Sequence, residues 1–257
     1  MSTITDDLRQ FYDAEAVKYT NTRKKVWSDA SLILNEIKKS EKKTLSVLEF
    51  GCGGWRLLEQ LWTLEWYKIN YTGIDISKNL LNLAKKEAAR KNLKAKISAT
   101  FVCDDILHAV KQYKQESFDF VIGIASFQHI TSLSERFFLM KSIYRILKYE
   151  WVLLMTNWSF SMWLCKKFWK EIVQSCLLAC VPFKKRNRND IMIPWKNGST
   201  TFQRFYHIYT LAELKKLIAM SGFIIQEVNF INKKGVRIAS RKDANNTFVV
   251  ARKNVFE

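Results

Sequence analysis

Glycine and proline are scarce in this chain. Its 257 residues include 8 glycines and 2 prolines, whereas average usage of about 7% would give about 18 glycines. Tryptophan, in contrast, is abundant, with 9 residues. A deficit of glycine combined with an excess of tryptophan is unusual. It suggests that some tryptophans occupy positions where glycine is expected.

Cysteine and histidine lack the spacing of a metal site or a disulfide framework. The cysteine count is odd, no C-x-x-C pair is present, and the histidines are scattered. This pattern favours reduced thiols over disulfides or zinc, and it predicts no metal centre. The residues concerned are Cys52, Cys103, Cys165, Cys176, Cys180, His108, His129 and His207.

The sequence also lacks a cationic leader and a membrane-spanning run. It opens Met-Ser-Thr-Ile-Thr-Asp-Asp, which does not resemble a signal peptide. The uncharged stretch from Trp151 to Cys165 contains polar residues and is closed by Lys166 and Lys167, so it falls short of the about 20 apolar residues that a bilayer requires. We therefore expect a cytoplasmic protein without a transmembrane segment.

Negative charge is under-represented. The chain has 42 basic and 24 acidic side chains, which gives a formal net charge of +18. One interpretation is a polyanionic partner, most simply RNA. The other is compositional, because a gene rich in Lys, Ile and Asn codons places lysines on any solvated face. Charge alone does not decide between them.

Short apolar runs alternate with helical patterns from residue 45 onward. This alternation predicts an α/β fold with a Rossmann-like, mostly parallel sheet of seven strands, helices on both faces and an antiparallel hairpin near the C-terminus. Residues 1–257 form one domain, with a helical arm at 1–44 and an insertion at 158–203 that interrupts the alternation. The expected strands are 45–50, 71–76, 99–103, 118–124, 152–156, 223–230 and 247–251.

Acidic residues and glycines follow these strands in the order of a nucleotide-type cofactor site. The first run ends in Glu49 and continues into a turn with Gly51 and Gly53, where backbone must approach a ligand closely. Asp75 ends the second run, at a position suited to hold both hydroxyls of a ribose. The candidate site is completed by Asp104, Asp105 and Ala125, which follow the third and fourth runs; Asp104 is suited to an adenine amine, and Asp105 could equally cap a helix.

The order of these segments resembles class I S-adenosylmethionine-dependent methyltransferases. The matching stretches are VLEFGCGGW, GIDIS, VCDDI, FDFVIGIASFQHI and ILKYEWVLLM. The resemblance implies S-adenosylmethionine as cofactor. A dinucleotide-binding redox enzyme is disfavoured, because the turn does not read G-x-G-x-x-G.

A narrower resemblance lies outside this core. Four segments, FYD (residues 11–13), TRKKVW, PWK and RFYHIY, are similar to parts of the methyltransferases that esterify 5-carboxymethyluridine at the tRNA wobble position. That family usually has His-His where this chain has Gln128-His129. The resemblance implies tRNA as a partner, a possible small activating subunit, and an acceptor site formed by Arg23, Arg204, His207 and His129.

Other functions remain open at this stage. The chain could methylate a small molecule or a lipid head group, with the apolar part of the insertion as a cover or a membrane-surface helix. It could also be an RNA-binding module that kept the fold without binding the cofactor. For any single histidine, core hydrogen bonding is an alternative to a place in the site.

Two tryptophans occupy positions that the family fills with glycine. Trp55 closes the cofactor turn, reading G-x-G-x-W for G-x-G-x-G, and Trp151 stands in LKYEW for L-K-P-G-G. With the skewed counts, this suggests a UGA codon that means glycine and was translated as tryptophan. An indole at position 55 is expected to crowd the cofactor contact, unless Trp55 folds outward over the start of the following helix.

Overall fold

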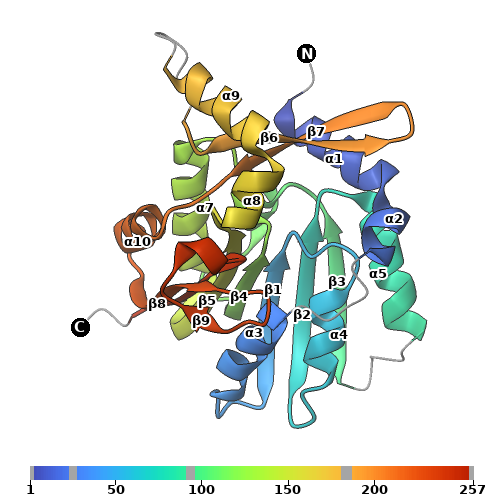
Figure 1. Ribbon diagram of the computed structural model, residues 1–257. Coiled ribbons are helices and arrows are strands. Elements are labelled where there is room, and N and C mark those ends of the chain that lie inside the picture. The colour runs from blue at the N-terminus through green and yellow to red at the C-terminus, as the bar shows by residue number, and fades with distance from the viewer. Residues whose placement is uncertain (1–2, 23–27, 91–95, 181–186, 255–257) are drawn as a thin grey trace.

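A single large sheet forms the centre of the protein (Figure 1). The computed structural model describes residues 3–22, 28–90, 96–180 and 187–254. The sheet has eight strands in the order β3-β2-β1-β4-β5-β10-β8-β9. Their bounds are β1 Thr44–Phe50, β2 Lys68–Asp75, β3 Ile97–Cys103, β4 Phe118–Ile124, β5 Leu147–Trp158, β8 Ile224–Ile231, β9 Arg237–Ile238 and β10 Asn246–Arg252.

The strands β1 to β5 are parallel, as the apolar runs predicted. β4 reads FDFVIGI and is buried at every position, which is typical of a central strand covered on both faces. The chain order reverses between β1 and β4, which are direct neighbours. Ligands of open α/β sheets bind outside the carboxyl ends of strands at such a reversal, so the topology itself places the site.

The C-terminal part confirms the antiparallel hairpin and corrects the strand count. β10 pairs antiparallel with both β5 and β8. The eighth strand is β9, two residues long, which pairs with the end of β8. It lies in the link between the last two expected strands, where a two-residue pairing leaves no periodic signal.

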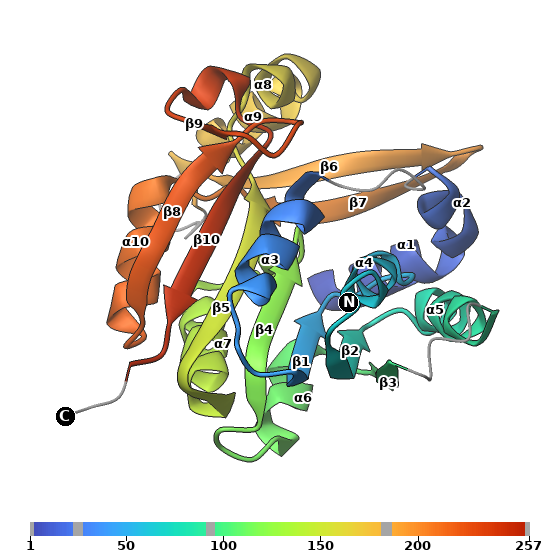
Figure 2. The same cartoon turned by 90° about the horizontal axis from the view of Figure 1, so that it is seen from below.

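Helices cover both faces of the sheet (Figure 2). One apolar cluster joins α3, α4 and α5 to the sheet, and a second joins α6, α7 and α10 to the opposite face. Two of the helices begin at serine N-caps: the Ser77 hydroxyl accepts from the Leu80 N–H, and Ser132 forms a capping box with Glu135. The bounds are α3 Ser28–Lys38, α4 Arg56–Trp62, α5 Lys78–Arg90, α6 Ile106–Ala109, α7 Leu133–Ile146 and α10 Leu211–Met220, with short 3₁₀ turns at Val110–Gln112, Phe127–His129 and Arg241–Asp243.

The N-terminal arm and the insertion meet over the carboxyl edge of the sheet. The arm contributes α1 (Ile4–Ala14) and α2 (Ala16–Asn21) besides α3. The insertion contains α8 (Met162–Lys167), α9 (Trp169–Ala179) and most of a separate hairpin of β6 (Asp190–Asn197) and β7 (Thr200–His207), whose second strand runs past residue 203, the expected end of the insertion. Figure 1 shows this hairpin crossing the top of the molecule beside α1, and α1 packs on β7.

Candidate active site

A glycine turn brings the ends of β1 and β4 together. Gly51 has a φ of 64°, and a Cβ added there would lie 2.4 Å from the Cβ of Ser126. The Ser126 hydroxyl donates to the Phe50 carbonyl over 2.9 Å. Only glycine therefore fits at position 51, as the sequence indicated.

Asp75 holds the same turn from the end of β2. Its carboxylate accepts hydrogen bonds from the N–H of Gly53 at 2.8 Å and of Ser77 at 2.9 Å. Burial raises the pKa of Asp75 to about 6, although both backbone hydrogen bonds oppose the shift. The carboxylate is thus oriented before any ligand arrives.

Glu49 is buried beneath the turn and has a partner that sequence reasoning missed. The Tyr71 hydroxyl donates to Glu49 Oε2 over 2.5 Å. Burial raises the pKa of Glu49 to about 8, against the opposing effect of this hydrogen bond. A Cβ at Gly73 would lie 2.9 Å from the Tyr71 ring, so a glycine at this position leaves room for the ring that reaches Glu49. The Tyr-x-Gly pattern of β2 is the local sequence signal for this contact.

The two aspartates after β3 have different roles. Asp105 Oδ1 accepts from the Leu107 N–H at 2.8 Å and caps α6, which was one of its two interpretations. Asp104 Oδ2 lies 2.6 Å from Nδ1 of His108, whose side chain is largely exposed. His108 was not expected near the site.

One cavity, here called the Asp75 cavity, collects most of the expected cofactor residues. Its lining includes Glu49, Gly51, Gly53, Asp75, Asp104, Asp105 and Ala125. Buried carboxylates beside a turn that admits only glycine fit a ligand with a hydroxyl-bearing sugar and an amine. Arg56, which follows the turn, also lines this cavity.

Trp55 is placed differently from the other turn residues. Its φ is 116°, in the left-handed range that favours glycine, and it is the N-cap residue of α4. It does not belong to the lining of the Asp75 cavity. Trp151 has no positive φ; the left-handed residue in LKYEW is Glu150, with a φ of 66°. The backbone therefore favours glycine at 55 and not at 151.

Helix α1 covers the Asp75 cavity and is fastened beside Asp75. Asp13 Oδ1 accepts from the Ser77 hydroxyl at 2.7 Å and from the Asn79 N–H at 3.0 Å. Tyr12, on the same helix, and Tyr19, on α2, line the cavity. These contacts join residues more than sixty positions apart, so no local pattern announced them.

A second cavity, here called the Tyr206 cavity, adjoins the first. Its lining includes Asp29, Gln128, Trp158, Trp163, Tyr206 and Lys233. The indole of Trp158 stacks on the Tyr206 ring with centroids 4.7 Å apart. Gln128, which stands where the wobble-uridine enzymes have a histidine, accepts from the Trp158 N–H at 2.7 Å.

His129 lies in the wall of both cavities. Its Nδ1 is 2.7 Å from the Phe205 carbonyl and its Nε2 is 3.2 Å from the Tyr12 hydroxyl. Burial lowers the pKa of His129 to about 4, and the charge of Arg204 acts in the same direction. The ring is therefore neutral at physiological pH.

Arg204 is a buried cation beside the Tyr206 cavity but does not line it. It is 4% exposed, and its Nη1 donates to the Tyr206 hydroxyl at 2.9 Å. Its Nε has no hydrogen-bond partner, and its guanidinium lies 4.9 Å from the centre of the Phe11 ring and 5.0 Å from that of Trp195. Within the described part of the chain, no carboxylate forms an ion pair with it.

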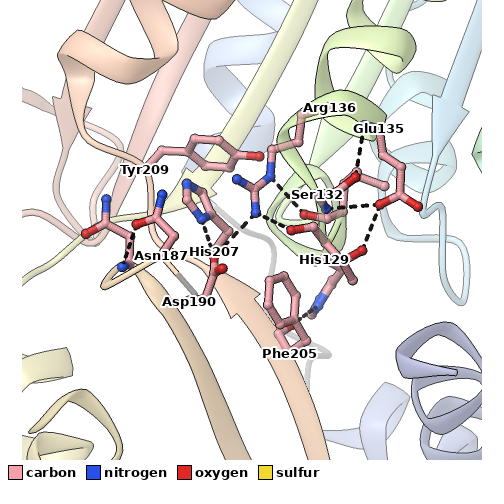
Figure 3. Close-up of polar contacts among 12 residues, drawn as sticks. His129, Ser132, Glu135, Arg136, Asn187, Asp190, Phe205, His207 and Tyr209 are labelled. Atoms are coloured by element: carbon pink, nitrogen blue, oxygen red, sulfur yellow. Dashed lines mark hydrogen bonds and ion pairs between the residues drawn. The ribbon is translucent and has the colours of Figure 1, made fainter. Parts of the chain in front are cut away.

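His207 belongs to a structural network and not to either cavity lining. Its Nδ1 is 2.5 Å from Asp190 Oδ1, and its Nε2 is 2.7 Å from Glu213 Oε1. Arg136 approaches the same Asp190 oxygen at 3.4 Å (Figure 3). The network ties the β6–β7 hairpin to α7 and α10, so the expectation of an acceptor contact at His207 does not match its position. Arg23, also expected at the acceptor site, lies outside the described residues.

Two searches restricted to the described residues were negative. No group of three His, Cys, Asp or Glu side chains there could hold a metal ion. None of the described helices combines the length and the apolar character that crossing a membrane requires.

One curated protein is similar to this chain over most of the chain's length. The chain is 28% identical over 200 residues to malonyl-[acyl-carrier protein] O-methyltransferase of Bacillus cereus, which covers 78% of this chain and 63% of that protein. The chain thus spans less than two thirds of that relative's length.

Solved structures of similar fold include several methyltransferases. One from Methanosarcina mazei has a TM-score of 0.67 at 20% identity and covers 86% of this chain and 98% of that one. A second is phosphoethanolamine N-methyltransferase 2 of Haemonchus contortus, in complex with phosphomonomethylethanolamine and S-adenosylhomocysteine. It has a TM-score of 0.68 at 17% identity, and the match covers 99% of this chain and 61% of that one. A third comes from a Haloferax volcanii complex between the Trm112 methyltransferase activator and a methyltransferase. It has a TM-score of 0.65 at 13% identity, and the match covers 97% of this chain and 98% of that one.

The family model described as "Methyltransferase domain" matches residues 41–213, from the start of β1 to the start of α10. This match spans the glycine turn, Asp75, Asp104 and the Tyr206 cavity's principal residues. The chain therefore belongs to the methyltransferase-domain family and carries a class I S-adenosylmethionine-dependent methyltransferase domain.

Proposed function

We propose that this enzyme methylates an anionic acceptor, the carboxylate of a 5-carboxymethyluridine in the wobble position of tRNA. The observation that carries the proposal is Arg204: a buried guanidinium without a carboxylate partner among the described residues, next to the Tyr206 cavity. Isolated buried charges are costly, so such a cation is suited to a site that receives an anion.

The residues of the Asp75 cavity would hold S-adenosylmethionine, which supplies an electrophilic methyl group. Asp75 would bind the ribose and Asp104 the adenine amine, while Ala125 and the glycine turn give backbone access. A carboxylate acceptor needs no base, because it is ionised at neutral pH. The protein's contribution is then position and electrostatics, in which Arg204 and Tyr206 hold the acceptor end.

Transfer RNA is favoured as the carrier by two observations. The net charge of +18 suits a polyanion, and the RFYHIY segment that resembles the wobble-uridine enzymes includes Arg204 and Tyr206. Because tRNA is the acceptor, we place the reaction in the cytoplasm. A small activating subunit belongs to the same proposal and is supported by the fold's similarity to a methyltransferase bound to an activator.

A small-molecule acceptor is the second candidate, and a specific observation favours it. The lining of the Tyr206 cavity includes a cation, Lys233, in addition to the buried Arg204 beside the cavity, so a free carboxylate or phosphate could be held there without RNA. The similar proteins include a malonyl-[acyl-carrier protein] O-methyltransferase and a phosphoethanolamine N-methyltransferase, and the small groups in these names carry a carboxylate and a phosphate.

A transfer assay separates the two candidates. The purified protein, with and without an activating subunit, is incubated with methyl-labelled S-adenosylmethionine and one of three acceptors: tRNA, malonyl-loaded acyl carrier protein or phosphoethanolamine. We expect label in tRNA as an alkali-labile ester. Label only in a small acceptor would replace the tRNA proposal with the second candidate. Absence of label in every acceptor, with the unmodified protein and with Trp55→Gly alike, would remove both.

Arg204→Met tests the acceptor anchor in the same assay. We expect transfer to fall at least tenfold while S-adenosylmethionine affinity stays within about twofold, because the guanidinium lies outside the Asp75 cavity. Arg237→Met is the matched control, since that arginine is half-exposed and pairs with Glu227 on β8. Equal transfer by the Arg204 and Arg237 variants would contradict the assignment.

A further inference from the structure

Two buried amide side chains, Gln128 and Asn246, belong to the lining of the Tyr206 cavity. Their exposed fractions are 1% and 6%. An amide has an oxygen that accepts hydrogen bonds and an NH₂ group that donates them. Buried polar atoms are nearly always hydrogen-bonded, so an amide atom without a partner at the wall of a cavity is suited to a ligand.

The orientation of the Gln128 amide follows from its contact with β5. Its Oε1 accepts from the Trp158 N–H at 2.7 Å, and the atom that faces this N–H must be the oxygen because a backbone N–H can only donate. Among the described residues, none accepts a hydrogen bond from the other amide atom, Nε2. Gln128 therefore offers a donor to the cavity.

Asn246 offers the opposite group. Its Nδ2 donates to Oδ2 of the buried Asp29 on α3. An ionised carboxylate only accepts, so the atom of Asn246 that remains is the oxygen, Oδ1. This oxygen is buried, and the described part of the chain supplies it with no donor. Asn246 therefore offers an acceptor.

Trp158 makes the two amides neighbours. Its N–H bonds to Gln128, and in the antiparallel pair of β5 and β10 it lies directly opposite Asn246. Opposite residues of such a pair have Cα atoms about 4.5–5.5 Å apart. A donor and an acceptor without partners are thus held close together at the carboxyl edge of the sheet.

A purely structural role accounts for one atom of each amide. Gln128 Oε1 fixes the end of β5, and Asn246 Nδ2 fastens β10 to α3. Neither contact uses the remaining atoms, and a buried carbonyl oxygen that stays unpaired destabilises the protein. The remaining pair is better explained by a ligand that donates to one amide and accepts from the other.

We propose that Gln128 and Asn246 recognise the base of the acceptor: Gln128 Nε2 donates to O4 of a uracil, and Asn246 Oδ1 accepts from its N3–H. This inference rests on the proposed function and names what separates a uridine from a cytidine. Cytosine has an amine donor at C4 and a bare nitrogen at position 3, the reverse pattern. The rings of Trp158 and Tyr206 add the aromatic surface on which recognised bases stack.

The order of the surrounding side chains agrees with this assignment. In 5-carboxymethyluridine, O4 is next to the carbon that carries the carboxymethyl group, and N3 is one position further round the ring. His129, which follows Gln128, packs on the Tyr206 ring with centroids 4.6 Å apart, and the Tyr206 hydroxyl is the one that Arg204 holds. Asn246 is fastened to α3 instead. A carboxylate held by Arg204 thus places O4 toward Gln128 and N3 toward Asn246.

Equilibrium binding tests the pair without cofactor or methyl transfer. NMR titration of the cofactor-free protein gives the dissociation constants of three nucleosides that share the sugar and the carboxylate: 5-carboxymethyluridine, 5-carboxymethylcytidine and 3-methyl-5-carboxymethyluridine. The third lacks the N3–H. We expect the first to bind at least about tenfold more tightly than either of the others, because each of them loses the matched donor and acceptor.

Gln128→Glu tests the donor. The variant keeps an oxygen for the Trp158 N–H and replaces Nε2 by a second oxygen, which repels O4 of uracil and accepts from the amine of cytosine. The ratio of uridine to cytidine affinity should fall by at least about tenfold. Gln112→Glu is the matched control, because that side chain is exposed and lies outside both cavities; its ratio should equal that of the unmodified protein.

Asn246→Ala tests the acceptor. Without Oδ1, the N3–H no longer gains a partner, so the preference for uridine over its 3-methyl derivative should disappear. The ratios distinguish recognition from a structural role, because a variant that only loosens the junction of β5 and β10 weakens all three nucleosides alike. The urea midpoint of each variant shows whether it is folded.

Equal binding of uridine and cytidine by the unmodified protein, binding of neither, or an unchanged ratio in Gln128→Glu would overturn the proposal, even if tRNA is methylated. The proposed function fails separately. If tRNA receives no methyl group in the transfer assay but the uridine preference is present and is lost in Gln128→Glu, tRNA is removed as the carrier and the recognition of uracil by this pair is upheld.

Discussion

Asp75 and Trp55 show how much a single residue can decide in this enzyme. Trp55 belongs to the turn that approaches the cofactor, and Asp75 holds that turn from the end of β2. Both were identified from the order of strands and glycines alone. The carboxylate of Asp75 is fixed by two backbone donors. The backbone of Trp55 has a φ of 116°, which favours glycine, although tryptophan has the largest side chain of all amino acids.

Replacing Asp75 by alanine should weaken cofactor binding. The variant loses charged hydrogen bonds to the ligand and also releases Gly53 and Ser77 from their shared acceptor. We expect a loss on the order of 2–3 kcal/mol in binding free energy, measured by calorimetry. Unchanged affinity would remove Asp75 from the site.

The two suspect tryptophans should respond in opposite ways to glycine. Trp55→Gly relieves a φ of 116° and should raise the free energy of unfolding by about 1 kcal/mol. Trp151→Gly should lower it, because the Trp151 indole packs on Phe120 with centroids 5.2 Å apart.

Two further measurements test whether Trp55 is a recoded glycine: the affinity for S-adenosylmethionine and the codon at position 55 of the gene. If UGA was read as tryptophan at position 55, Trp55→Gly also restores the native turn and should tighten S-adenosylmethionine binding. Urea unfolding and calorimetry measure both effects. Destabilisation by Trp55→Gly, tight binding by the unmodified chain, or a UGG codon at position 55 would refute the recoding hypothesis.

Glu49 should make stability depend on pH. Its pKa is raised from 4.5 to about 8 in the folded state, so the folded protein binds this proton more tightly than the unfolded chain. The stability from this group is complete below about pH 4.5 and is lost as the pH rises through about 8.

Glu49→Gln mimics the protonated form of the side chain. As the pH rises from 5 to 9, the free energy of unfolding of this variant should fall less than that of the wild type. The difference in unfolding free energy between variant and wild type, measured in urea without cofactor, should therefore shift in favour of the variant from pH 5 to pH 9. A difference that stays constant with pH would show that Glu49 keeps its ordinary pKa.

At the scale of elements, the β6–β7 hairpin depends on the His207 network. His207 is fully buried between Asp190 and Glu213. Although burial opposes it, the hydrogen bond and charge of His207 lower the pKa of the Glu213 carboxyl. Removing the ring would leave two carboxylates facing each other near Arg136.

His207→Ala should therefore destabilise the protein by about 3 kcal/mol, which is the lower end for a broken buried pair because its partners are partly exposed. His108→Ala is the control; that side chain is 66% exposed, so a change below about 1 kcal/mol is expected. Urea unfolding measures both. Similar losses in the two variants would contradict the structural role of His207.

The sequence predicted the elements with strong local signals. The strands β1 to β5 followed from apolar runs. The hairpin in the insertion was missed because β6 contains Pro194 and several polar residues, which weaken the apolar pattern of a strand. Tyr12 was missed as a partner of His129 because the contact joins residues 117 positions apart.

At the scale of the whole molecule, the positive charge is the feature that fold and site leave unexplained. A net charge of +18 predicts tRNA binding through phosphate contacts. We expect the logarithm of the association constant to fall linearly with the logarithm of salt, with a slope of about −4 for about five contacts. A slope near zero in filter binding would favour the compositional origin of the charge.

The most direct measurement of the central claim is mass spectrometry of tRNA nucleosides from cells with and without the gene. The proposal predicts that the methyl ester of 5-carboxymethyluridine disappears without the gene and that the free acid accumulates. Restoring the gene should restore the ester, and restoring the Arg204→Met version should not. Identical nucleoside profiles in the two strains would contradict tRNA as the substrate of this methyltransferase.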